Sequence, residues 1–120
     1  MSRPNQERFD PTAHPLVSIL IRTMGRATLV GTLDSVAAQT YPHIEVVLID
    51  ARGTCELDTC ESCGEFPIRL VSSGRRLGRG AAANLGLDSA WGEFLLFLDD
   101  DDWLLPEHVA GLVEAIQSRE

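Results

Sequence analysis

Four consecutive aspartates, Asp99, Asp100, Asp101 and Asp102, are the residues whose type and spacing point most directly to chemistry. Adjacent carboxylates repel one another, so in a partly buried loop they either take up protons or gather a cation. Their oxygens suit a hard divalent ion, Mg²⁺ or Mn²⁺, which usually completes its shell with waters and substrate phosphates. The run therefore predicts a metal site that receives an anionic substrate. The alternative keeps Asp101 and Asp102 as solvated turn residues, favoured by the dipole of a following helix.

Two further segments carry candidate ligands for a phosphate or a nucleoside. Residues 74–80 are glycine-rich and basic and lead into a predicted helix, so their amides and guanidinium groups could bind phosphate; a flexible surface loop is the alternative. Asp50, at the end of a predicted strand, could accept hydrogen bonds from a base or ribose, or it could cap the turn that follows.

Three cysteines, Cys55, Cys60 and Cys63, cluster in one polar segment. An odd number does not suit the disulfide framework of a small secreted protein, so reduced thiols are predicted. We favour a plain surface loop here. The alternative is a zinc site completed by His43, because three thiolates and one imidazole form a known ligand set.

Composition and charge narrow the class of protein. The chain has 120 residues, enough for one compact domain, and a formal net charge of −8. Such an acidic balance argues against nucleic acid as a partner. No apolar run reaches the roughly 18 residues that a membrane-spanning helix needs, and the polar start lacks the apolar stretch of a signal peptide. We therefore expect a cytoplasmic location.

The elements that must position these residues are read from apolar patterns. Continuous apolar runs, typical of strands buried on both faces, cover residues 16–21, 44–49, 68–71 and 94–98. Helical patterns lie between and after them, over residues 27–39, 81–90 and the segment that follows Pro106. Alternating strands and helices predict an α/β fold, a doubly wound and mainly parallel open sheet. Residues 51–67 show no clear helical stripe, so a short helix or an irregular loop would both fit there.

Ligands of such sheets bind beyond the carboxyl ends of the strands, where the strand order reverses. A strand order of 3-2-1-4 would place the first and fourth predicted strands side by side. Arg22 and Thr23, which follow the first strand, would then lie near the aspartates that follow the fourth.

The order of these pieces resembles family 2 of the inverting glycosyltransferases, which have the GT-A fold. The matching stretches are residues 15–21, 33–36, 39–42, 44–50 and 92–98 with the aspartates and Pro106, together with Asn84 and Gly86 in a helix signature. The resemblance implies a Rossmann-like nucleotide-binding half over residues 15–120, after a flexible arm at residues 1–14, with the acceptor half absent. Sugar transfer from a nucleoside diphosphate sugar, a UDP-sugar, to an unknown acceptor is the implied activity.

The resemblance also implies roles for single residues. A D-x-D element with Mg²⁺ or Mn²⁺ corresponds to Asp99, Asp100 and Asp101, with Asp101 and Asp99 as the metal ligands. We expect the nucleotide-sugar to bind through the following residues: Arg22, Thr23, Asp50, Asp99 and Asp100. The family's general base belongs to the second half, so we expect this fragment alone to be inactive, and membrane association only through further parts of a longer chain.

Three positions depart from the family's usual pattern. Met24 stands in place of an aromatic residue, Ala51 in place of a second carboxylate after the second strand, and Ala83 in place of an arginine before the helix asparagine. These departures motivate a second hypothesis, a non-catalytic regulatory or interaction module with a degenerate glycosyltransferase fold.

Overall fold

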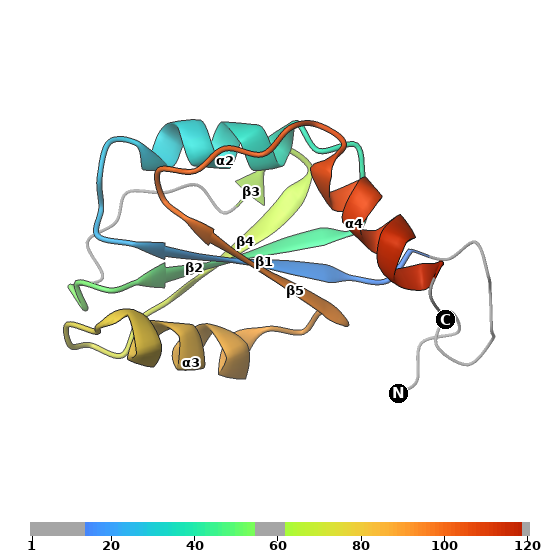
Figure 1. The fold of residues 1–120 in the computed structure, drawn as a ribbon. Helices are drawn as coiled ribbons and strands as arrows, with labels where there is room; N and C mark the ends of the chain where they lie inside the picture. Colours follow the sequence, from blue (N-terminus) through green and yellow to red (C-terminus); the bar gives the residue numbers. More distant parts are fainter. Residues whose placement is uncertain (1–13, 55–61, 119–120) are drawn as a thin grey trace.

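A computed structural model describes residues 14–54 and 62–118 as one open sheet with helices on both faces (Figure 1). In chain order the elements are β1 (Val17–Thr23), α2 (Leu29–Ala37), β2 (Ile44–Asp50), β3 (Ser62–Cys63), β4 (Phe66–Val71), α3 (Arg79–Ser89), β5 (Phe94–Asp99) and α4 (His108–Gln117). None of the helices in these two ranges is both long enough and apolar enough to cross a membrane.

The strands lie in the order β3-β4-β2-β1-β5. β4, β2, β1 and β5 are parallel, and β3 is an antiparallel addition at one edge. The four strands that the sequence predicts thus take the predicted order 3-2-1-4, and the α/β class is confirmed. β1 lies between β2 and β5, with Arg22 paired to Ile49 on one side and to Asp99 on the other.

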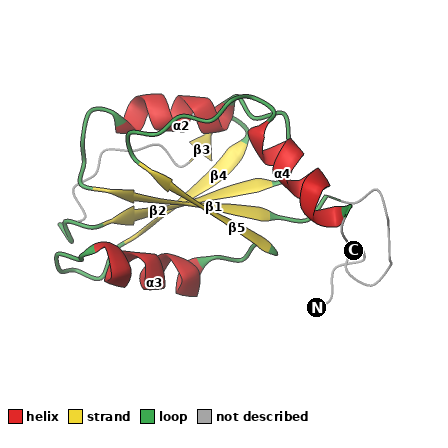
Figure 2. Cartoon of the chain, viewed as in Figure 1, coloured by secondary structure: helices red, strands yellow, loops and turns green. Residues whose placement is uncertain are grey.

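Helices α2 and α4 cover one face of the sheet and α3 covers the other (Figure 2). The larger core lies on the first face, where Ile19, Ile21 and Leu48 pack with Val36 of α2 and Val109 of α4. The smaller core, on the α3 face, is built by Leu20, Val47, Ile49 and Ala82. Side chains of a strand alternate between its two faces, so the apolar runs fill both cores at once.

A buried polar network joins the amino-terminal ends of the strands. Glu45 is only 3% exposed, and its carboxylate accepts hydrogen bonds from Ser18 Oγ at 2.5 Å and Trp91 N at 2.8 Å. Arg69 Nη2 of β4 donates to the same carboxylate at 2.8 Å. Burial alone raises the pKa of Glu45, but these hydrogen bonds outweigh it and lower the pKa below the ordinary value.

The observed helices differ from the predicted ones at their ends. The helix predicted over residues 27–39 is shorter, Leu29–Ala37, because Gln39 turns into the structure instead of continuing the helix. Its side-chain amide donates to Leu105 O at 2.7 Å and accepts from Val109 N at 3.0 Å. These two bonds hold the segment between β5 and α4 against α2.

The segment between β2 and β4 contains a strand that the sequence does not predict, β3. The surface-loop interpretation of the cysteines is wrong for Cys63, which is 5% exposed and lies in that strand. Its thiol donates to Leu33 O at 2.9 Å, and burial raises its pKa to about 11. Cys55 and Cys60, and with them the zinc alternative, lie outside the described residues.

The predicted arm also lies outside the described residues, apart from His14. The His14 ring packs edge-on against Tyr41, with 5.4 Å between the ring centroids. Tyr41 in turn donates through its hydroxyl to Pro15 O. This last residue of the predicted arm is therefore fixed to the domain.

Candidate functional site

The predicted site residues lie at the carboxyl edge of the sheet, and strand alternation divides them between its two faces. Thr23 follows Ile21 on the face of α2, and Asp50 follows Leu48 on the same face. Arg22 follows Leu20 on the face of α3 and lines a cavity there. Arg22 and Thr23, which are neighbours in the sequence, thus point to opposite faces of the sheet.

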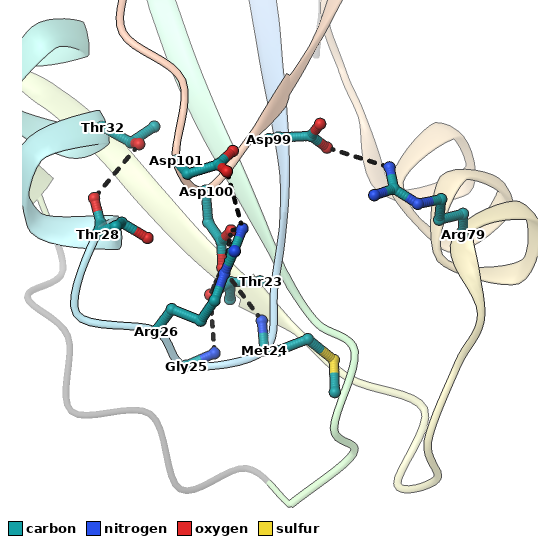
Figure 3. A network of polar contacts seen from close by, with 10 residues as sticks. All are labelled: Thr23, Met24, Gly25, Arg26, Thr28, Thr32, Arg79, Asp99, Asp100 and Asp101. Carbon is teal, nitrogen blue, oxygen red and sulfur yellow. Dashed lines mark hydrogen bonds and ion pairs between the residues drawn. The ribbon is translucent and has the colours of Figure 1, made fainter.

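Asp100 lies inside the α2 face and binds the loop that follows β1 (Figure 3). It is 3% exposed, and its carboxylate accepts from Thr23 Oγ1 at 2.8 Å, Met24 N at 3.3 Å and Arg26 Nε at 3.0 Å. Arg26 Nη2 also donates to it. Burial alone raises the pKa of Asp100, but the bonds from Arg26, Thr23 and Met24 N outweigh it and lower the pKa. The proximity of Thr23 to the aspartates, predicted from the strand order, is confirmed.

Arg26 is a site residue that sequence reasoning missed. Besides its bonds to Asp100, its Nη2 lies 3.5 Å from Asp101 Oδ2. The turn at Gly25, which has φ of 78° and whose N–H donates to Thr23 Oγ1 at 2.9 Å, brings Arg26 back over the aspartates. The only sequence signal was a basic residue after a glycine in the loop following β1.

Asp99, Asp101 and Asp102 form the one group of potential metal ligands found among residues 14–54 and 62–118. One carboxylate oxygen from each lies within 4.8 Å of the others. The side chains of Asp99 and Asp101 are about half exposed, at 49% and 48%. α4 begins only at His108, so Asp101 and Asp102 lie outside its first turn and its dipole does not account for them. Both side chains are exposed and Asp101 lies in a turn, as the alternative of solvated turn residues predicts. The structure brings together the two predicted metal ligands and adds Asp102.

A cavity of about 260 Å³ adjoins this group on the α3 face of the sheet. Its polar lining comes from Arg22, Arg79, Asp99 and Asp102. Its apolar lining comes from Leu20, Ile49, Ala83, Phe97 and Leu98. Arg79, the first residue of α3, places its Nη1 at 3.6 Å from Asp99 Oδ1 (Figure 3). Of the predicted nucleotide-sugar residues, Arg22 and Asp99 face this cavity.

Asp50 is fully buried and caps the turn after β2, which was the second of its two interpretations. Its Oδ1 accepts from Arg52 N at 3.0 Å and lies 3.7 Å from Arg52 Nε. The same turn binds the basic loop after β4, because Leu77 N donates to Ala51 O at 2.8 Å. Arg75, Arg76 and Arg79 are all exposed, and of these three only Arg79 reaches the acidic group.

Comparison with known proteins points to one family. A sequence model of the family described as glycosyl transferase family 2 matches residues 18–120. EpsH of Bacillus subtilis, a protein named as a glycosyltransferase, is 33% identical over 97 residues, which cover 78% of this chain and 28% of EpsH. The glycosyltransferase GlyA of Streptococcus pneumoniae is 33% identical over 86 residues, covering 70% of this chain and 12% of GlyA.

Among solved structures, TarS of S. aureus shares the fold. The crystal structure of TarS in complex with UDP-GlcNAc superimposes with a TM-score of 0.71 at 24% identity, covering 86% of this chain and 31% of that one. The chain thus spans less than half of the length of the relatives it matches.

Proposed function

Because this chain belongs to glycosyl transferase family 2, we propose that it is the part of a glycosyltransferase that binds the sugar donor. The donor is a nucleoside diphosphate sugar, and a UDP-sugar is the first choice because the TarS structure of the same fold was solved with UDP-GlcNAc. One observation carries the proposal: a group of three carboxylates adjoins a cavity at the carboxyl edge of a parallel sheet, where such folds bind their ligands.

The proposed metal is Mg²⁺ or Mn²⁺, held by Asp99, Asp101 and Asp102. The residues fit such an ion, because the donors are all carboxylate oxygens and lie close enough together to share it. When bound, the ion supplies Lewis-acid stabilisation of the negative charge on the departing diphosphate. Arg26, 3.5 Å from Asp101, would hold that carboxylate in place from the other side.

The predicted donor-binding residues take different parts in this proposal. Asp99 touches both the cavity and the metal group. Thr23 and Asp100 act as positioning residues, since they hold the loop after β1 in the conformation that brings Arg26 to Asp101. Asp50 fixes the turn after β2 against the loop that leads into α3. Acceptor binding and the general base are assigned to the further length that the relatives possess beyond this match.

Titration calorimetry with UDP and UDP-GlcNAc, in Mn²⁺ and in EDTA, tests the proposal. We expect binding in Mn²⁺ that is at least about tenfold weaker in EDTA, since coordination to a phosphate is lost. Asp101→Asn should weaken the Mn²⁺-dependent binding similarly. Asp88→Asn removes the same charge from an exposed site at the other end of α3 and should leave binding unchanged.

Two results would count against donor binding. One is the absence of binding to either nucleotide with and without the metal. The other is a gain in melting temperature for Asp99→Asn and Asp101→Asn with no change in ligand response. The second result would instead support the non-catalytic module, in which the carboxylates only repel one another.

A further inference from the structure

Arg22 lines the cavity beside the metal group, and one of its guanidinium nitrogens has no hydrogen-bond partner. Its Nε is buried and has no hydrogen-bond acceptor, and no ion pair to Arg22 is found within residues 14–54 and 62–118. Arg26 and Arg69, in contrast, are paired with Asp100 and Glu45. A buried guanidinium donor without an acceptor is unfavourable and uncommon in native structures, so its presence in a cavity points to a ligand.

Arg79 lines the same cavity from a different element. Arg22 comes from the end of β1 and Arg79 from the start of α3, and Asp99 lies in the lining with both of them. The 3.6 Å contact between Arg79 and Asp99 is too long for a strong hydrogen bond, and the Arg79 side chain is 77% exposed. Its guanidinium is therefore able to turn toward a ligand in the cavity.

The charge of the neighbouring metal group decides what that ligand would be. Three carboxylates more than neutralise a divalent ion, so the loaded group of Asp99, Asp101 and Asp102 keeps a net negative charge. An ion held in this way can coordinate a phosphate oxygen but leaves most of the charge of a diphosphate uncompensated. Arg26 does not reverse this, because it is paired with the buried Asp100. The two guanidiniums of the cavity supply the positive charge that a diphosphate needs, and their planar donors match phosphate oxygens.

We propose that Arg22 and Arg79 form a guanidinium pair that binds the diphosphate of the donor from the α3 face of the sheet, next to the metal group. This assignment rests on the proposed function and adds a second anchor to it. The cavity is also lined by the apolar side chains of Leu20, Ile49 and Phe97. They lower the local polarity and so strengthen each hydrogen bond between a guanidinium and a phosphate oxygen.

Calorimetry with UDP and with inorganic pyrophosphate, both in Mn²⁺, tests the pair through Arg22→Gln. Loss of a charged hydrogen bond should weaken both probes roughly 10- to 100-fold. Arg76→Gln makes the same charge change at an exposed arginine of the same edge that does not line the cavity, and should change binding less than about threefold. Arg79→Gln should weaken binding in the same direction as Arg22→Gln.

Arg22→Lys keeps the charge but not the planar donor set, so we expect intermediate binding. Melting curves verify that each variant is folded.

If Arg22→Gln and Arg76→Gln both bind UDP and pyrophosphate as tightly as the original protein does, the guanidinium pair is refuted while donor binding stands. An effect of Arg22→Gln on UDP-glucuronic acid but not on UDP would also refute it, because the arginine would then bind a sugar carboxylate. Pyrophosphate binding without UDP binding would retain the pair and overturn the donor assignment, and binding of neither probe would overturn both.

Discussion

The four aspartates have the same side chain and four different environments. Asp100 is buried and fully hydrogen-bonded, Asp99 faces the α3 side beside Arg79, and Asp101 lies near Arg26. Asp102 is exposed and close enough to Asp99 and Asp101 to share an ion with them. Their contributions to stability and to binding should therefore separate when they are replaced one at a time.

Asp100→Asn should destabilise the fold more than any other single change in the run. The amide cannot balance the charge of Arg26 and cannot accept all the bonds that the carboxylate accepts, so we expect a loss of about 1.5–3 kcal/mol in the free energy of unfolding. Asp102→Asn, at an exposed position, should stay within about 0.5 kcal/mol of the original protein. Urea denaturation measures both, and equal midpoints would show that Asp100 does not hold the loop after β1.

At this scale the sequence predicted which residues gather, but not how each one is used. The alternation of side chains along β1 already implies that Arg22 and Thr23 face opposite sides. The burial of Asp100 and the return of Arg26 depend on the conformation of the turn at Gly25, which strand and helix patterns do not specify. For this reason the sequence predicts a ligand-binding role for Asp100, which instead holds the loop after β1, and predicts no role for Arg26.

Helix α3 lines one side of the cavity through Arg79 and Ala83, and its distance from the sheet depends on Gly86. A Cβ at this position would lie 2.7 Å from both Leu20 Cδ2 and Ile49 Cδ1. Gly86→Ala should therefore force α3 outward and cost about 1–3 kcal/mol of unfolding free energy through overpacking. Gly80→Ala, in the first turn of the same helix with no atom within 4 Å of its Cβ, should be neutral or stabilising by up to about 1 kcal/mol.

Thermal and urea unfolding of the two glycine variants provides the measurement. If Gly86→Ala unfolds like the original protein, the close approach of α3 to the sheet is not a constraint. If it is destabilised, its affinity for UDP should fall as well, because Arg79 and Ala83 of α3 line the cavity.

Elements with long apolar patterns were predictable and short ones were not. The four parallel strands are buried on one or both faces, and this burial is visible in the sequence as continuous apolar runs. β3 has two residues and is defined by its pairing of Ser62 with Pro67 and Cys63 with Phe66. A pairing of this kind arises from tertiary structure, and no local periodicity records it.

For the whole molecule, the two buried carboxyl groups whose pKa values are lowered predict the response to acid. The pKa values of Asp100 and Glu45 are lowered in the folded state from ordinary values of 3.8 and 4.5. Such groups stabilise the fold fully above those values, and the stabilisation is lost as pH falls through the lowered pKa values. We therefore expect the urea midpoint to be level near pH 6 and to fall steeply below about pH 4.

Glu45→Gln is the variant that separates this cause from general acid denaturation. It should be less stable than the original protein at pH 6 and should lose less stability between pH 5 and pH 3, since one titrating group is removed. Curves that stay parallel over this range would show that Glu45 does not contribute to the acid response. Glu93→Gln, at an exposed position, serves as the control with the same charge change.

The order of the sheet was predictable because few topologies satisfy parallel pairing with right-handed crossovers. It brings the loops after β1 and β5 together, so the general location of the site followed from the order alone. The cavity on the α3 face did not follow, because it depends on how closely α3 packs and on which side chains remain unpaired.

The alternation of the aspartates also constrains insertions and deletions. Because successive side chains of β5 point to opposite faces, a gain or loss of one residue within β5 would turn part of its apolar side chains away from the core they pack in. Adding a fifth aspartate after Asp102 would only lengthen the loop to α4, and such changes are well tolerated. In sequences that descend from this one, insertions and deletions should therefore be common in the loop after Asp102 and rare within β5, even where the inserted residue is itself an aspartate.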